Sequence, residues 1–233
     1  DSTSELLSLL NNWNLDGLIL TGIFPSDFFT ELLAQPTPFL LVDSYVLSEV
    51  PQIRLEDRKG GYIATRHLLE KGHRRILFCG PPLHEQGVLR ERFEGYRQAL
   101  AEYGLTPRPE DVYSLEIGIS RSAALGRELA QRDDFTAIFA TADILAAGLI
   151  SGLNEAGKRV PQDVSIVGFD DLNITRLTSP QLTTVHQDIT LRGSQAANLL
   201  IAHIQRDPAA VNSVTMPVRL VERQSVASRK PEP

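Results

Sequence analysis

Short runs of apolar residues alternate along the chain with longer segments whose apolar residues recur at helical spacing. Gly17–Gly22 and Phe39–Val42 are examples of the runs, and a glycine or proline closes most of the longer segments. Such runs predict buried strands, and the longer periodic segments predict amphipathic helices. We expect strands at 17–22, 39–42, 76–79, 112–115, 137–140, 164–169 and 182–185, and helices at 26–34, 59–71, 90–103, 120–131, 143–156 and 191–206.

Three further segments fit the same pattern. Residues 6–10 predict a short amphipathic helix, residues 52–55 an edge strand, and residues 214–221 an extended segment. Strands that alternate with helices in this way build mainly parallel sheets covered by helices on both faces. The sequence therefore predicts a doubly wound α/β fold.

Composition and charge narrow the class of protein. The chain has 233 residues, 42% of them hydrophobic, and a formal net charge of −6. An acidic surface argues against binding nucleic acid or anionic membranes through bulk charge. Cys79 is the single cysteine, so no disulfide can form within the chain, and no segment has the roughly 18–20 apolar residues that a spanning helix needs. These features fit a cytoplasmic location.

Sequence signatures of catalysis are missing. The chain has no P-loop, no nucleophile elbow, no zinc-protease motif and no dinucleotide fingerprint after a strand. Its five histidines are scattered, and none forms a pair at helical spacing that could hold a metal. We therefore expect no enzymatic activity, no cofactor and no metal site.

Polar residues at the carboxyl ends of the expected strands are candidate ligand contacts, because ligands of open α/β sheets bind outside those ends. Asp43, Asp143 and Asp170 each follow an expected strand, and Arg92 begins the helix after the strand at 76–79. Carboxylates accept hydroxyl hydrogens and a guanidinium donates to oxygens, so this set suits a neutral polyhydroxylated ligand. Phe24 and Phe169 could stack on a sugar face.

Each candidate also has a purely structural interpretation. Asp143 directly precedes a helix, where an N-cap is the favoured reading, and Asp171 could cap the following turn. Asp43 could be an ordinary loop carboxylate, and Arg92 a surface arginine paired with a neighbouring glutamate. Strand phenylalanines are usually core residues.

Several longer motifs resemble the lactose-repressor/galactose-repressor (LacI/GalR) family of bacterial transcription regulators. They occur in order from Leu15 to Ser225 and are specific as a set, although each is weak alone. They are Leu15-Asp-Gly-Leu-Ile-Leu20, His67-Leu-Leu-Glu-Lys-Gly-His-Arg-Arg-Ile76, Arg92-Phe-Glu-Gly-Tyr96, Phe139-Ala-Thr-Ala-Asp143, Val160-Pro-Gln-Asp-Val-Ser-Ile-Val-Gly-Phe-Asp-Asp171, Pro180-Gln-Leu-Thr-Thr-Val-His-Gln187 and Leu220-Val-Glu-Arg-Gln-Ser225.

The resemblance implies a two-lobed fold of the type I periplasmic-binding-protein kind. The first lobe is expected to hold residues 1–82 and 187–213, and the second residues 83–186 and 214–233. A small-molecule effector, sugar-like in chemistry, is expected in the cleft between the two lobes of one chain, and the chain is expected to form a homodimer. By position, Arg92 and Asp170 match ligand-contacting residues of the family, Asp43 matches a strand-end carboxylate, and Gln187 lies in a crossing strand.

Two departures from the family pattern bear on function. Ala142 stands where many members have a ligand-binding asparagine, which implies a less polar pocket. The N-terminal helix-turn-helix and the first strand and helix of the first lobe are also missing from this sequence. The resemblance thus implies the effector-sensing, dimerising part of a repressor-type regulator whose operator contacts lie elsewhere. The alternative is a periplasmic sugar-binding protein of the same fold.

Overall fold

The computed structural model describes residues 15–24, 26–45, 50–207 and 213–229. The helix expected at residues 6–10 lies outside this part of the chain. The chain divides into two compact units, which are considered separately. The first unit is Asp1–Leu55 with Asp188–Met216, and the second is Glu56–Gln187 with Pro217–Pro233.

The first unit is built on a four-stranded sheet in the order β1-β2-β3-β9. All three pairings are parallel, with Leu18 opposite Phe39 and Gln52 opposite Ser213. The strands are β1 (Leu18–Thr21), β2 (Phe39–Val42), β3 (Gln52–Leu55) and β9 (Ser213–Met216). The expectation of an edge strand at 52–55 is wrong, because β9 pairs with the far side of β3.

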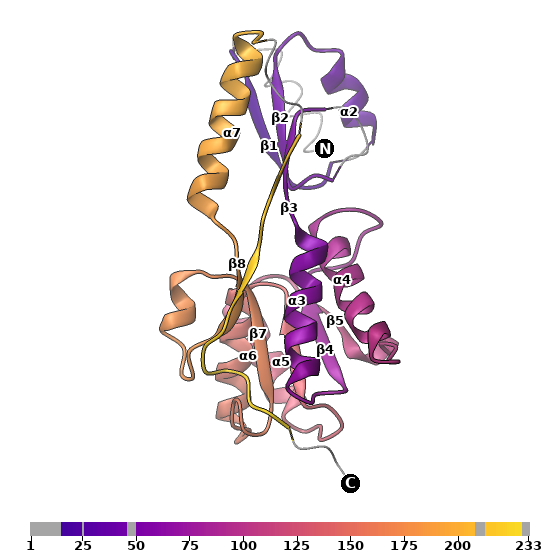
Figure 1. Ribbon diagram of the computed structural model, residues 1–233, viewed down its shortest axis with the longest axis vertical. Coiled ribbons are helices and arrows are strands. Elements are labelled where there is room, and N and C mark those ends of the chain that lie inside the picture. The colour runs from indigo at the N-terminus through magenta and orange to yellow at the C-terminus, as the bar shows by residue number, and fades with distance from the viewer. Residues whose placement is uncertain (1–14, 25, 46–49, 208–212, 230–233) are drawn as a thin grey trace. The chain divides into compact units, whose positions relative to one another are not determined.

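Two helices cover this sheet on opposite sides, α2 (Ser26–Leu33) and α7 (Ile189–Ile204) (Figure 1). Alternate strand residues serve the two faces, as the period of a strand requires. Leu20 and Leu41 form a core cluster with Phe28 and Leu32 of α2. The result is a small α/β layer whose β2 strand is buried along its whole length.

The second unit holds a six-stranded sheet in the order β10-β8-β7-β6-β4-β5. Its pairings are parallel except for the antiparallel edge strand β10. The strands are β4 (Ile76–Gly80), β5 (Val112–Ser114), β6 (Ala137–Ala140), β7 (Ser165–Asp170), β8 (Thr183–His186) and β10 (Arg219–Val221). The predicted mainly parallel α/β fold is confirmed.

Helices pack on this sheet in pairs. They are α3 (Asp57–Glu70), α4 (Val88–Glu102), α5 (Ile119–Leu129) and α6 (Asp143–Glu155), with 3-10 turns at Pro109–Asp111 and Asn173–Arg176. Leu77 and Cys79 of β4 belong to the core under α5 and α6, whereas Phe78 packs against Tyr96 of α4. Helices α3 and α4 touch backbone to backbone, since a Cβ on Gly95 would lie 1.9 Å from the Arg58 carbonyl oxygen.

The boundary between the units differs from the expected one. The family resemblance places residues 56–82 in the first lobe. In the structure, β4 is hydrogen-bonded between β5 and β6 in the sheet of the second unit. The first crossing therefore follows Leu55. A strand that is apolar on both faces can enter either sheet, so its pattern alone does not assign it. The last crossing follows Met216, because β9 still pairs with β3.

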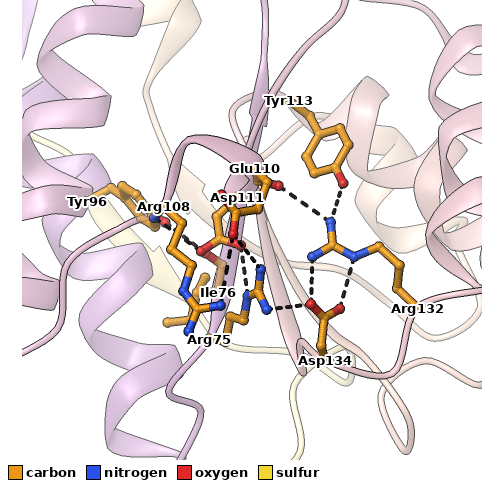
Figure 2. A network of polar contacts seen from close by, with 9 residues as sticks. All are labelled: Arg75, Ile76, Tyr96, Arg108, Glu110, Asp111, Tyr113, Arg132 and Asp134. Atoms are coloured by element: carbon orange, nitrogen blue, oxygen red, sulfur yellow. Dashed lines mark hydrogen bonds and ion pairs between the residues drawn. The ribbon is translucent and has the colours of Figure 1, made fainter.

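A network of polar contacts between charged residues lies at the amino-terminal edge of the second sheet (Figure 2). Arg75, just before β4, donates to Asp111 at 2.9 Å and also binds Asp134. Arg132 binds both oxygens of Asp134, at 2.9 and 3.0 Å, and the hydroxyl of Tyr113. At this edge, arginine and aspartate side chains that precede neighbouring strands form ion pairs and hydrogen bonds with one another.

Among the described residues, the structure contains no helix that combines the length and apolar character needed to cross a bilayer.

Candidate functional site

The carboxyl-terminal edge of the second sheet gathers polar residues from three neighbouring strands. Thr141 follows β6, Asp170 ends β7, and Gln187 follows β8. The strands β6 and β8 lie on either side of β7, so Thr141 and Gln187 flank the end of β7 at which Asp170 lies. This is the edge at which open parallel sheets bind ligands.

Arg92, the fifth residue of α4, lies buried beside this edge. Its Nε donates to Asp57 Oδ1 at 2.7 Å, and its Nη1 donates to the carbonyl oxygen of Thr141 at 2.6 Å. Among the described residues, no group accepts a hydrogen bond from Nη2. The structural interpretation of Arg92 as a surface arginine paired with a neighbouring glutamate is therefore wrong, since its anionic partner is Asp57 from α3.

Phe169 forms the apolar support of Arg92. The guanidinium carbon lies 3.4 Å from the centre of the Phe169 ring, and the ring is completely buried. A buried guanidinium over an aromatic face gains cation–π attraction. Arg92 covers one face of this buried ring in the ligand-free protein, and stacking of Phe169 on a ligand stays a prediction.

Two buried polar atoms at this edge have no partner among the described residues. Gln187 is buried, and its Nε2 donates to Asp170 Oδ1, which orients the amide. Within the described part of the chain, only two buried side-chain oxygen or nitrogen atoms lack a hydrogen-bond partner, Gln187 Oε1 and Thr141 Oγ1. Buried polar groups are nearly always paired, so these two atoms call for an explanation.

The turn after β7 has an unusual backbone. Asp170 and Asp171 both have positive φ angles, of 112° and 58°. Asp171 Oδ2 lies 2.9 Å from His186 Nδ1, and Oδ1 accepts from Arg223. Burial acts to raise the pKa of Asp171, but these hydrogen bonds outweigh it and the pKa is lowered. Asp171 is therefore an ion-pair residue and does not cap the following turn.

Asp143 has a structural position inside the second unit. The residue is fully buried, its Oδ1 accepts from Thr184 Oγ1 at 2.6 Å, and its Oδ2 accepts from the Leu172 backbone at 2.8 Å. Burial raises the pKa of this carboxyl to about 7. Both oxygens already accept a hydrogen bond within the protein, and contact of Asp143 with a ligand stays a prediction. The N-cap interpretation is wrong, since Ala142 is the N-cap of α6.

In the first unit, Asp43 lies at the carboxyl end of β2 with a φ angle of 59°. Arg192 of α7 donates through Nη1 to its two carboxylate oxygens, at 3.2 and 2.9 Å. Both side chains are about one-fifth exposed. The carboxylate is therefore held in place but still reaches solvent, as a ligand contact would require.

Phe24 lies in the loop after β1 of the first unit. Its ring stacks on Phe28 of α2 with centroids 4.9 Å apart and meets Phe29 edge-on at 6.0 Å. The side chain is partly buried, so part of its surface remains open to solvent. Its contact with a ligand stays a prediction.

Sequence reasoning missed two residues of the site. Asp57 pairs with Arg92 from 35 positions away, and no spacing rule connects them. Thr141 directly follows an expected strand, so the strand-end rule would also select its hydroxyl.

Comparison with known proteins gives the family. The model of a periplasmic binding protein-like domain matches residues 65–226. The HTH-type transcriptional repressor PurR of Haemophilus influenzae (strain PittEE) is 33% identical over 235 residues, which cover 95% of this chain and 68% of the relative. The chain belongs to the LacI family of transcriptional regulators.

Solved structures of LacI family members agree with the fold of this chain. A regulator from Enterococcus faecium with bound ribose is 31% identical, with a TM-score of 0.86 and coverage of 99% of this chain and 86% of that one. The transcriptional regulator CelR in complex with cellobiose is 28% identical, with the same TM-score and coverage of 96% and 69%. The chain thus corresponds to the effector-binding domain of a LacI family regulator.

Proposed function

We propose that this chain senses a sugar or sugar derivative and controls operator binding by the regulator to which it belongs. The effector contacts the carboxyl-terminal edge of the second sheet, where Arg92, Asp170 and Gln187 are the binding residues. Operator contacts come from a helix-turn-helix that is not in this sequence. As expected from the family, the chain forms a homodimer and catalyses no reaction.

One observation carries this proposal. In the described residues, two buried side-chain atoms lack a hydrogen-bond partner, and they belong to Thr141 and Gln187. Each of these residues directly follows a strand at the carboxyl-terminal edge of the second sheet. Leaving such an atom unpaired costs about 1–3 kcal/mol. The charged residues at the opposite edge are mutually paired, so a ligand is the simplest group that would satisfy the carboxyl edge.

The unpaired atoms favour a hydroxyl-bearing ligand. Gln187 Oε1 can only accept, Arg92 Nη2 can only donate, and a hydroxyl group can serve both. Asp170 lies beside Gln187, so a phosphate or carboxylate would meet a like charge there. Ribose and cellobiose, bound by the two related structures, are neutral polyhydroxylated compounds. These facts support a neutral sugar over an anionic metabolite.

The first unit contributes further proposed contacts. Asp43 offers acceptors that Arg192 holds in position, and Phe24 offers a partly exposed ring for stacking on a sugar face. Asp43 is expected to accept hydrogen bonds from ligand hydroxyls.

Control of operator binding requires that the effector prefer one state of the dimer. A ligand shifts such an equilibrium only by its differential affinity, typically about 1–3 kcal/mol of coupling. Whether the effector induces or represses follows from which state it prefers.

A thermal-shift screen tests the proposal. Wild-type protein is heated with D-ribose, cellobiose, adenosine and a hexose phosphate, because a ligand that binds only the folded state raises the melting temperature. We expect a neutral sugar to stabilise the protein. Gln187→Met, which removes the free acceptor, should weaken binding about tenfold, whereas Gln131→Met at an exposed glutamine should not. If none of these compounds raises the melting temperature, the proposal is contradicted.

A further inference from the structure

The hydroxyl of Thr141 lies in a slot with apolar neighbours. The residue is 2% exposed, and its Oγ1 has no hydrogen-bond partner within the described residues. A Cβ placed on Gly80 would lie 2.3 Å from this oxygen and 3.1 Å from a methyl carbon of Leu89. Glycine at position 80 therefore provides the space that the Thr141 side chain fills, and Leu89 of α4 covers the same space.

The backbone around this hydroxyl is already satisfied. The Thr141 amide donates to the Cys79 carbonyl at 2.8 Å, and the Gly80 carbonyl accepts from Leu115 at 2.9 Å. The Thr141 carbonyl accepts from Arg92. A buried water is held by two to four polar partners, whereas the slot offers mainly the glycine backbone and a leucine methyl. A structural water is thus a poor explanation for the hydroxyl.

Valine has nearly the same shape as threonine and would fill the slot without an unpaired group. Threonine at this position lowers the stability of the ligand-free protein, because its hydroxyl is removed from water without compensation. Such a cost is explained if the hydroxyl gains a partner in another state of the protein. Arg92, a proposed effector-binding residue, donates to the Thr141 carbonyl oxygen. The Thr141 hydroxyl therefore lies next to the proposed effector contacts, and the effector is the candidate partner.

We propose that Thr141 is a specificity-determining residue, whose hydroxyl bonds an oxygen atom of the effector. The inference rests on the proposed function and adds a contact to the same site. The effector oxygen enters the slot beside Gly80, and the partly buried Leu89 side chain moves aside to admit it. Thr141 thereby selects ligands that carry a hydroxyl at this point over analogues that lack it.

The test compares Thr141→Val with Thr141→Ser, which keeps the hydroxyl. Melting temperatures are measured without ligand, and affinities are measured by calorimetry with the compound from D-ribose, cellobiose, adenosine and a hexose phosphate that stabilises the wild type most. We expect Thr141→Val to raise the ligand-free melting temperature by about 2–8 °C and to weaken binding about 5- to 100-fold. Thr141→Ser should keep the affinity within about threefold of wild type.

The outcomes separate this inference from the proposed function. Failure of every compound to bind wild-type protein overturns the proposed function and the Thr141 contact with it. Binding to wild type with unchanged affinity in Thr141→Val overturns the Thr141 contact alone. A lower ligand-free melting temperature in Thr141→Val also overturns it, because the hydroxyl would then have a stabilising partner in the protein.

Discussion

The ion pair between Arg92 and Asp57 should contribute strongly to the stability of the second unit. Both side chains are nearly inaccessible, at 7% and 0% exposed, and the Nε–Oδ1 distance is 2.7 Å. Removing one partner of a buried pair leaves the other charge uncompensated and costs about 3–5 kcal/mol. We therefore expect Arg92→Met, which keeps the apolar stem over Phe169, to destabilise the protein by about that amount.

A double-mutant cycle tests whether the loss comes from the pair. Asp57→Asn alone should also destabilise, because the buried Arg92 guanidinium then has a neutral acceptor in place of its counter-charge. The double variant should be less destabilised than the sum of the single variants, with a coupling of about 2–3 kcal/mol. The reason is that the second substitution removes a charge that the first left unpaired.

Urea unfolding followed by circular dichroism measures these differences, and the melting temperature of Arg92→Met should fall by about 6–20 °C. Arg90→Met is the matched control. Arg90 is in the same helical turn, is 40% exposed and pairs with Glu94 at 2.9 Å, so its loss should cost less than about 1 kcal/mol. Additive single variants, or equal losses in Arg92→Met and Arg90→Met, would refute the role assigned to the buried pair.

Two buried titratable groups should give opposite pH dependences. Burial lowers the pKa of His73 from 6.5 to about 4, so its stabilising contribution is complete above pH 6.5 and is lost towards pH 4, about 3 kcal/mol in all. His73→Gln should remove this loss in urea unfolding curves taken between pH 4 and 7. Burial raises the pKa of Asp143 from 3.8 to about 7, so its contribution is complete below pH 3.8 and is lost as the pH rises to 7, about 4 kcal/mol. Asp143→Asn should abolish that loss, and a variant with the wild-type pH profile would contradict the assigned pKa shift.

The sequence predicts the elements of this fold well because strands buried on both faces are short and almost wholly apolar. The segments at 39–42 and 137–140 appear in the structure with those bounds. Assignment of a strand to a sheet is harder, since β4 would fit the pattern of either unit. Its hydrogen bonds to β5 and β6 depend on the whole chain path, which local periodicity does not contain.

The candidate site was predicted in part for a related reason. The strand-end rule places Asp170 at the carboxyl-terminal edge of the sheet, where the structure also has it, because parallel strands bring their carboxyl ends together. The rule does not say whether a side chain faces a ligand or another part of the protein. Asp143 follows the same rule but turns inward to Thr184 and Leu172, which become neighbours only after folding.

The two edges of the second sheet differ in how completely their polar groups are paired. At the amino edge, Arg75 and Asp134 precede neighbouring strands and complete each other's bonds. At the carboxyl edge, Thr141 and Gln187 each have an oxygen atom without a partner in the part of the chain that the structure describes. Folded proteins are stable by only about 5–15 kcal/mol, so two unpaired groups at about 1–3 kcal/mol each are a substantial loss. Under the proposed function, a ligand that pairs both atoms recovers that loss only while it is bound, and the carboxyl edge then responds to the effector in a way that the paired amino edge does not.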